Sequence, residues 1–278
     1  MPYDEAQQAA TRARFARLVA QRDADIDLAL GALTIAAAGR PTVDAAASLA
    51  VLDDLADRVR LRLDVGDGHD RILDRLHDVL YRERGFRGPT AADFHDPANS
   101  LLDVVLDRRI GLPISLAIVE LEVAWRIGVG LTGIGLPGHF IVGAPGGVLI
   151  DPAGGGRRLT PDDCQALMRR SLGEGVLFNV GMLRPAGRRD ILTRVLRNLR
   201  AAHLAARDWP AALGAVELLA VIEPIDPDHG RDRGLLLGRM GRFNEALAAL
   251  SRYLDERPDG HDVGDVRQVM GIFAGRRN

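Results

Sequence analysis

Three side chains in the middle of the sequence have the types needed for nucleophilic chemistry: Ser115, His139 and Asp151. A serine can attack a carbonyl group when a histidine removes its proton and a carboxylate orients that histidine. A serine hydroxyl depends on such a general base more than a cysteine thiol does. The sequence therefore predicts a candidate triad, provided that the fold brings the three residues together.

Each of the three residues also has an ordinary structural explanation. Ser115 follows Pro113 closely and could cap a helix. His139 could be a core histidine with satisfied hydrogen bonds, and Asp151 before Pro152 is a common turn pair. Their order along the chain favours a shared location.

A helix must position Ser115. The turn Gly111-Leu112-Pro113 precedes an apolar stripe at helical spacing, so Ser115 should lie in the first turn. Free backbone N–H groups and the positive end of the helix dipole are found there. The stripe consists of Leu116, Val119, Val123 and Ile127.

Short strands must position the other two residues. Apolar runs at 131–135, 140–142 and 148–150 are separated by Gly and Pro, and 144–147 is typical of a hairpin turn. A four-residue loop would place His139 opposite Pro152 and turn Asp151 to the other face. An odd loop would instead pair His139 with Asp151. The triad hypothesis therefore predicts an odd loop or a bulge at the hairpin tip.

We expect three regions along the chain. Residues 1–90 carry helical apolar stripes and no chemical motif, so they form a helical layer, in which Asp44 caps one helix. Residues 91–185 form the core with the candidate triad. Residues 186–278 form a helical tail.

The tail contains an internal repeat of 34 residues. Trp209-Pro-Ala-Ala-Leu matches Phe243-Asn-Glu-Ala-Leu, and Pro224 matches Pro258. This period is typical of tetratricopeptide helix pairs. Two units are too few for a free-standing solenoid, so the tail should pack on the preceding domain. It either supports the core structurally or offers a peptide-docking groove, with Trp209 and Phe243 as candidate binding residues.

The central region resembles the transglutaminase-like superfamily, within the papain-like fold. The resemblance rests on Asn99, the run V-L-D-R-R-I-G-L-P-I-S-L, G-L-P-G-H-F at 135–140 and I-D-P at 150–152. With R-D-R-G-L-L-L-G-R-M-G-R-F in the tail, the chain is most similar to a bacterial Sir B-type branch with a tetratricopeptide-like tail. The resemblance implies an α+β protein whose central helix packs on a small antiparallel sheet.

The resemblance also implies roles for residues. His139 and Asp151 fall on the catalytic histidine and aspartate, whereas Ser115 falls where catalytic relatives have cysteine. Asn99 is a further candidate, either holding the loop before Ser115 or capping the helix from Leu101. We expect a non-catalytic protein- or peptide-binding module, a pseudoenzyme. The alternative is a hydrolase or acyl-transfer enzyme that uses Ser115, His139 and Asp151.

Composition restricts the remaining possibilities. With 278 residues, 47% hydrophobic and a net charge of −2, the chain is typical of a soluble cytoplasmic protein. The sequence has no basic patch that would predict nucleic-acid binding and no apolar run long enough to predict a membrane span. Cys164 is the single cysteine, so it cannot form an internal disulfide. The histidines lack an H-x-x-x-H spacing, and Gly154–Gly156 lacks the phosphate-loop pattern. We therefore expect no metal and no cofactor, and the oligomeric state stays open.

Overall fold

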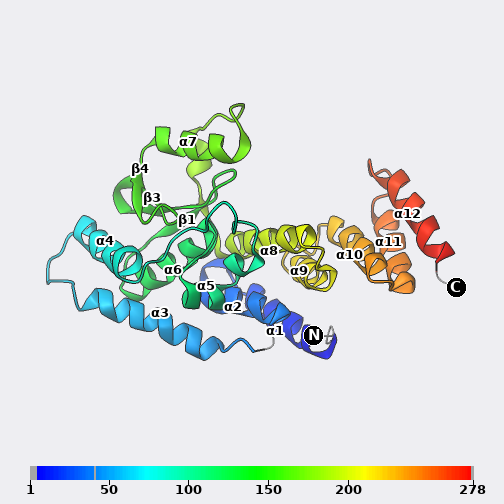
Figure 1. Ribbon diagram of the computed structural model, residues 1–278, viewed down its shortest axis with the longest axis horizontal. Coiled ribbons are helices and arrows are strands. Elements are labelled where there is room, and N and C mark those ends of the chain that lie inside the picture. Colours follow the sequence, from blue (N-terminus) through cyan, green and yellow to red (C-terminus); the bar gives the residue numbers. More distant parts are fainter. Residues whose placement is uncertain (1–4, 41, 277–278) are drawn as a thin grey trace.

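The computed structural model describes residues 5–40 and 42–276, so residues 1–4 of the polar N-terminal stretch lie outside the described part. Helices dominate it, and a single small sheet lies over the central helices (Figure 1). The C-terminal helices extend away from this body in a row. The expected α+β class, with a helical layer, a central core and a helical tail, is confirmed.

Four α-helices form the N-terminal layer within the residues that the structure describes. Asp44 accepts a hydrogen bond from Ala47 N at 3.0 Å and caps the third of them, as its position predicts. The fourth helix continues directly into a six-residue π-helix, a rare geometry that is often found at functional sites. The elements are α1 (Glu5–Val19), α2 (Leu28–Gly39), α3 (Ala45–Arg60), α4 (His69–His77) and the π-helix η2 (Asp78–Glu83).

Helix α6 (Pro113–Arg126) is the centre of the molecule. Eleven consecutive residues, from Ile114 to Ala124, are buried. Pro113 at the first helical position fixes its start, because the missing N–H has no partner there anyway. The short helix α5 (Leu102–Arg108) precedes it and ends at Arg109 in the left-handed conformation.

Five antiparallel strands form one sheet in the order β4-β3-β2-β1-β5. Val142 and Ile150 pack in the main core with α6, whereas Ile141 and Leu149 pack in a smaller cluster with the next helix, α7 (Pro161–Leu172). The sheet therefore lies between α6 and α7, as Figure 1 shows. The strands are β1 (Thr132–Ile134), β2 (Ile141–Ala144), β3 (Val148–Asp151), β4 (Arg157–Leu159) and β5 (Pro185–Ala186).

Two strands were not predicted, and one begins later than expected. β4 reads Arg-Arg-Leu with two exposed arginines, and β5 has two residues of which the first is proline. Neither carries the apolar pattern that identifies a strand. β2 begins at Ile141, one residue after the start of the predicted run 140–142, and His139 lies in the turn before it.

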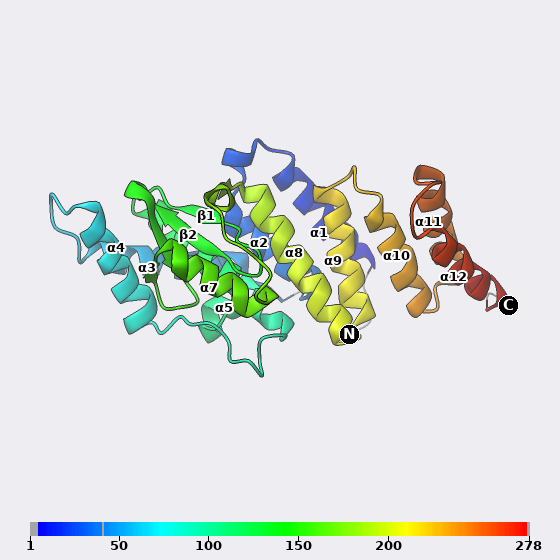
Figure 2. The same cartoon turned by 90° about the horizontal axis from the view of Figure 1, so that it is seen from above.

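The tail forms successive antiparallel helix pairs that lie side by side (Figure 2). Trp209 and Phe243 stand at the first positions of α9 and α11, which is the equivalence that the 34-residue period predicts. The helices are α8 (Arg188–Ala205), α9 (Trp209–Ile222), α10 (Asp228–Arg239), α11 (Phe243–Glu256) and α12 (Val263–Gly275).

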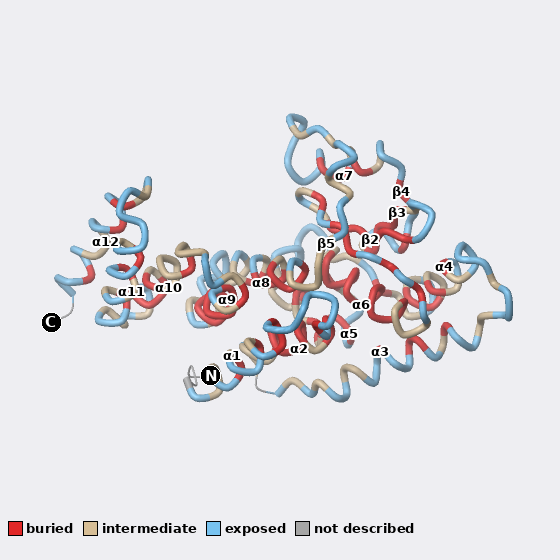
Figure 3. The backbone as a smooth tube through the Cα atoms, turned by 180° about the vertical axis from the view of Figure 1, so that it is seen from behind, coloured by how far each residue is buried: buried red, intermediate tan, exposed pale blue. Residues whose placement is uncertain are grey.

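Helix α9 connects the tail to the rest of the molecule. Leu218 and Leu219 belong to the main hydrophobic core, together with residues of α1, α2, α6 and α8. Leu213 and Val216 belong to a second core that α10, α11 and α12 complete. Figure 3 shows buried stretches in α6, α8 and α9. The tail is therefore packed on the preceding region, as expected for so few repeats.

Within the described residues, no helix is both long and apolar enough to span a membrane.

Candidate functional site

Ser115 lies in the first turn of α6 but does not cap it. Leu112 is the N-cap residue, and no side chain makes a capping hydrogen bond there. Ser115 is only 1% exposed, and its Oγ is buried with no hydrogen-bond partner among the described residues. The capping explanation for Ser115 is therefore wrong.

His139 and Asp151 lie together at the end of the β2–β3 hairpin. Ala144 pairs with Val148, so the loop Pro145–Gly147 has three residues, an odd number as the triad hypothesis requires. Continuing this register places Asp151 opposite Ile141. Ile141 comes two residues after His139 in the chain, so Asp151 and His139 point to the same side of the hairpin. The contact is therefore diagonal and not direct, with Nε2 of His139 2.9 Å from Oδ1 of Asp151.

The turn that carries His139 is held from the tail side by Arg194 of α8. Its guanidinium donates to the carbonyl of His139 at 2.7 Å and to that of Leu136 at 2.9 Å. The same guanidinium lies 5.5 Å from the ring centroid of Phe140. One arginine of the tail thus fixes the backbone on both sides of the turn.

The hydrogen bond between Ser115 and His139 is not made. Ser115 Oγ makes no hydrogen bond to any residue in the described part of the chain, although Asp151 already orients the imidazole of His139. A serine needs this contact for activation, because its hydroxyl is not ionised near neutrality. The structure thus contains an oriented base without an engaged nucleophile.

A buried carboxylate next to this site was not found from the sequence. Glu120 of α6 is completely buried, and it contacts His77 Nε2 at 3.0 Å and the Tyr81 hydroxyl at 2.5 Å. His77 ends α4, and Tyr81 lies in the π-helix that follows. The π-helix therefore presents one of the two partners of Glu120. A charged residue inside a buried helical stripe was the only sequence signal for it.

This cluster lies close to Asp151. Burial raises the pKa of the Tyr81 hydroxyl well above its ordinary value, and the negative charges of Glu120 and Asp151 raise it further. Gly156, in the turn after β3, adopts φ +77°, and a Cβ there would lie 2.7 Å from the Tyr81 ring. The turn that follows Asp151 thus packs directly on Tyr81 and His77.

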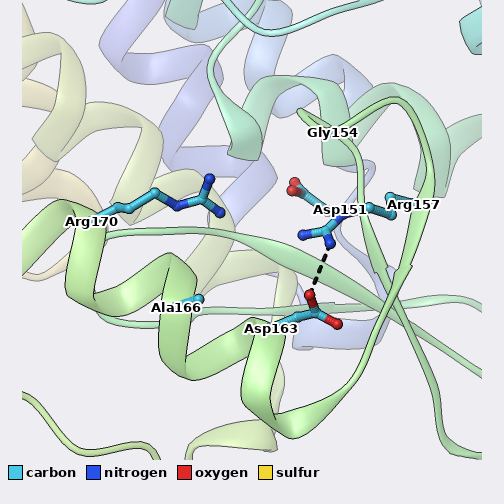
Figure 4. A pocket seen from close by; sticks show the side chains of 6 residues that line it. All are labelled: Asp151, Gly154, Arg157, Asp163, Ala166 and Arg170. Carbon is cyan, nitrogen blue, oxygen red and sulfur yellow. Dashed lines mark hydrogen bonds and ion pairs between the residues drawn. The ribbon is translucent and has the colours of Figure 1, made fainter.

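An open pocket of about 470 Å³ lies between this turn and α7 (Figure 4). Asp151 and Gly154 line one side, and Asp163 and Arg170 line the other. The guanidinium of Arg157 donates a hydrogen bond to Oδ1 of Asp163 at 2.8 Å, whereas Arg170 extends from α7 toward Asp151. Neither Ser115 nor His139 lines this pocket. It is therefore suited to hold a polar or acidic group beside the candidate triad, but it gives no route to the serine.

The other predicted site residues, Asn99, Trp209 and Phe243, contribute to loop structure and to packing. Asn99 is fully buried, its side-chain amide donates to Asp93 O at 2.7 Å, and its backbone carbonyl accepts from Leu112 N at 2.9 Å. It thus holds the loop before α6, while Leu101 is the N-cap of α5. Trp209 and Phe243 are half-buried and pack on the second core.

Cys164 lies in the small cluster beneath α7. It is fully buried, as its place in the sequence predicts, and burial raises the pKa of its thiol. The negative charges of Asp163 and Asp151 raise this pKa further. Cys164 is therefore a poor nucleophile.

Comparison with known families matches two parts of the chain. The Transglutaminase-like superfamily profile matches residues 46–197, more than half of the chain. A Tetratricopeptide repeat profile matches residues 199–271. The boundary between the two matches falls within α8.

Curated relatives cover most of the chain. A UPF0162 protein of Xylella fastidiosa is 36% identical over 198 residues, which are 69% of this chain and 70% of the relative. The UPF0162 protein of Pseudomonas aeruginosa is 37% identical over 209 residues, 73% and 75% of the two chains. F-box only protein 21 of Homo sapiens is 34% identical over 109 residues, 35% of this chain and 17% of that protein. No solved structure matches the chain significantly.

Proposed function

Because this chain belongs to the transglutaminase-like superfamily and carries a tetratricopeptide tail, we propose that it is a non-catalytic protein- or peptide-binding module. One observation carries the proposal. The position of the nucleophile holds Ser115, whose hydroxyl is buried and has no hydrogen bond to His139 or to any other described residue. A buried, unactivated hydroxyl cannot attack a substrate.

The pocket beside Asp151 is the proposed contact point on the core. Arg170 has no ion-pair partner among the described residues and extends across the pocket, so its guanidinium can bind a carboxylate of a partner. The tail supplies a second surface on the same body, since α8 and α9 share the main core with the sheet. A peptide partner with an acidic side chain or C-terminus fits this arrangement best.

The rival is a hydrolase or acyl-transfer enzyme with a Ser-His-Asp triad. The observation in its favour is the hydrogen bond of 2.9 Å between His139 and Asp151, which supplies an oriented base. This enzyme also needs Ser115 to reach both His139 and solvent. A rearrangement of α6 or of the His139 turn would be required for that, so we rank it second.

The test selects peptide ligands from a random display library on the folded protein and measures the affinity of the best ligand. Ser115→Ala should leave this affinity within about twofold, whereas Arg170→Ala should weaken it about tenfold, because a charge-assisted hydrogen bond is lost. Arg82→Ala is the matched control, since Arg82 is an exposed arginine paired with Asp78 outside the pocket.

Two results would count against the proposal. Cleavage of the selected peptide, abolished by Ser115→Ala, would establish the enzyme. Unchanged affinity in Arg170→Ala would remove the core pocket from the binding surface and leave the tail as the contact.

A further inference from the structure

The connection between α9 and α10 brings together three side chains that can ligate a metal ion. Glu223 directly follows α9, Asp226 lies in the turn, and His229 is the second residue of α10. Nε2 of His229 lies 3.3 Å from Oε2 of Glu223 and 3.8 Å from Oδ2 of Asp226. All three ligand atoms lie within 4.8 Å of one another.

His229 and Glu223 are poorly satisfied without a further partner. The His229 side chain is only 4% exposed, and neither of its ring nitrogens has a hydrogen-bond partner among the described residues. Oε2 of Glu223 is also buried without a hydrogen bond, although it faces the imidazole. Buried polar atoms in native proteins are almost always paired, so two such atoms facing each other point to an absent ligand.

We propose that Glu223, Asp226 and His229 bind a divalent transition-metal ion of the Zn²⁺ class. Zn²⁺ bonds of ~2.0–2.2 Å in tetrahedral geometry place ligand atoms roughly 3.3–3.6 Å apart. The separations from Nε2 are 3.3 Å to Oε2 of Glu223, within this range, and 3.8 Å to Oδ2 of Asp226, slightly above it. An imidazole nitrogen favours Zn²⁺, Co²⁺ or Ni²⁺ over Ca²⁺ and Mg²⁺, which take oxygen ligands.

The other carboxylate oxygens are already held by the protein. Oε1 of Glu223 accepts from Arg197 at 2.7 Å, which leaves Oε2 for the ion. Oδ1 of Asp226 accepts from Asp228 N at 3.0 Å, which leaves Oδ2. Such contacts orient ligands in known metal sites. Two carboxylates beside one arginine also leave the site with net negative charge.

Solvent can reach the site from one side. The Asp226 side chain is 38% exposed, whereas His229 is almost fully buried. A metal ion can therefore enter past Asp226, and water can complete a four-coordinate shell. The bound ion would join the end of α9 to the first turn of α10 and so brace the tail where its second hydrophobic core begins.

This proposal is independent of the proposed binding function. The proposed ligands do not form an H-x-x-x-H pair, because they are one histidine and two carboxylates at three-residue spacing.

The test titrates untagged, chelator-treated protein with Co²⁺ and follows the visible d–d absorption of the bound ion, with Zn²⁺ as the competitor. We expect one equivalent to bind and to be displaced by Zn²⁺, and Zn²⁺ to raise the Tm of the wild type. His229→Gln and Asp226→Asn should each weaken Co²⁺ binding at least tenfold and abolish the Tm increase.

His203→Gln is the matched control, because His203 lies in the same tail beside a single carboxylate, 3.7 Å from Asp208. It should bind Co²⁺ as the wild type does. Asp226→Asn keeps the test valid if His229→Gln fails to fold, because the Asp226 side chain is half-exposed. Absence of stoichiometric binding to the wild type would overturn the proposal. Equal binding by the wild type, His229→Gln and Asp226→Asn would also overturn it, as an adventitious surface site.

Discussion

Nε2 of His139 lies 2.9 Å from Oδ1 of Asp151, on a hairpin whose three-residue loop brings the two side chains to the same face. The contact has the geometry that a base and its orienting carboxylate adopt in a nucleophilic triad. The third member, Ser115, is buried in the first turn of α6 without a partner. We therefore expect the His139–Asp151 pair to stabilise the folded protein, and this contribution can be measured as a free energy of unfolding.

Replacing His139 by alanine should destabilise the protein. Asp151 is 6% exposed at its side chain and would lose its donor, which costs about 1–3 kcal/mol in the free energy of unfolding. Urea denaturation measures this difference, and His95→Ala, at an exposed histidine, is the control. A change below about 0.5 kcal/mol, no larger than that of an ordinary surface substitution, would mean that the pair adds nothing to stability.

Tyr81→Phe should also lower the free energy of unfolding. The Tyr81 hydroxyl, whose pKa burial raises above its ordinary value, is protonated at neutral pH and donates to the fully buried Glu120. Removing this donor should cost about 1–3 kcal/mol. Tyr253→Phe is the matched control, because Tyr253 also donates to a carboxylate, that of Asp262. The Asp262 side chain is 15% exposed and can recruit water, so this variant should lose less stability. Equal losses in the two variants would contradict the special burial of Glu120.

Gly156→Ala should be more harmful than Gly155→Ala. Both glycines have φ near +75°, so both substitutions carry the same backbone strain. A Cβ at 156 would also lie 2.7 Å from Tyr81 and 2.8 Å from His77, whereas nothing lies within 4 Å at 155. The difference in the free energy of unfolding should be about 1–3 kcal/mol, the usual cost of overpacking. Equal stability of the two variants would show that the turn does not pack on Tyr81.

Asp163 should make stability fall in acid. Hydrogen bonds from the backbone and side chain of Thr160, with help from Arg157, lower the pKa of Asp163 from 3.8 to about 2. A depressed folded-state pKa stabilises the protein above the unfolded value, and this contribution is lost as pH falls from about 4 to about 2. Asp163→Asn should thus have a flatter stability profile in this window than the wild type. Parallel profiles for Asp163→Asn and wild type would refute this assignment.

The local patterns predicted the elements around the site well. Pro113 followed by an apolar stripe predicted the start of α6. The 34-residue offset predicted the equivalence of Trp209 and Phe243, because helix pairs of one length repeat the same packing. These signals are local or periodic, so the sequence alone carries them.

Long-range contacts could not be predicted. Glu120 is 43 residues from His77, and only the packing of α4 and the π-helix on α6 brings the two together. Arg194 reaches the His139 turn from α8 across 55 residues. An odd loop was predicted to pair His139 directly with Asp151, but the contact is diagonal. The sequence does not determine which residues form the loop, and these set the register.

The most direct test of the central claim is the reactivity of a thiol placed at position 115. Ser115→Cys is treated with iodoacetamide, and mass spectrometry compares the labelling rate at this position with that of Cys164. The buried Cys164, whose pKa is raised, is an internal reference for a protected thiol, and Ser251→Cys on the exposed side of α11 is the reactive control. A non-catalytic, sealed site predicts labelling no faster than that of Cys164. Rapid labelling that His139→Ala abolishes would contradict it and establish a working catalytic geometry.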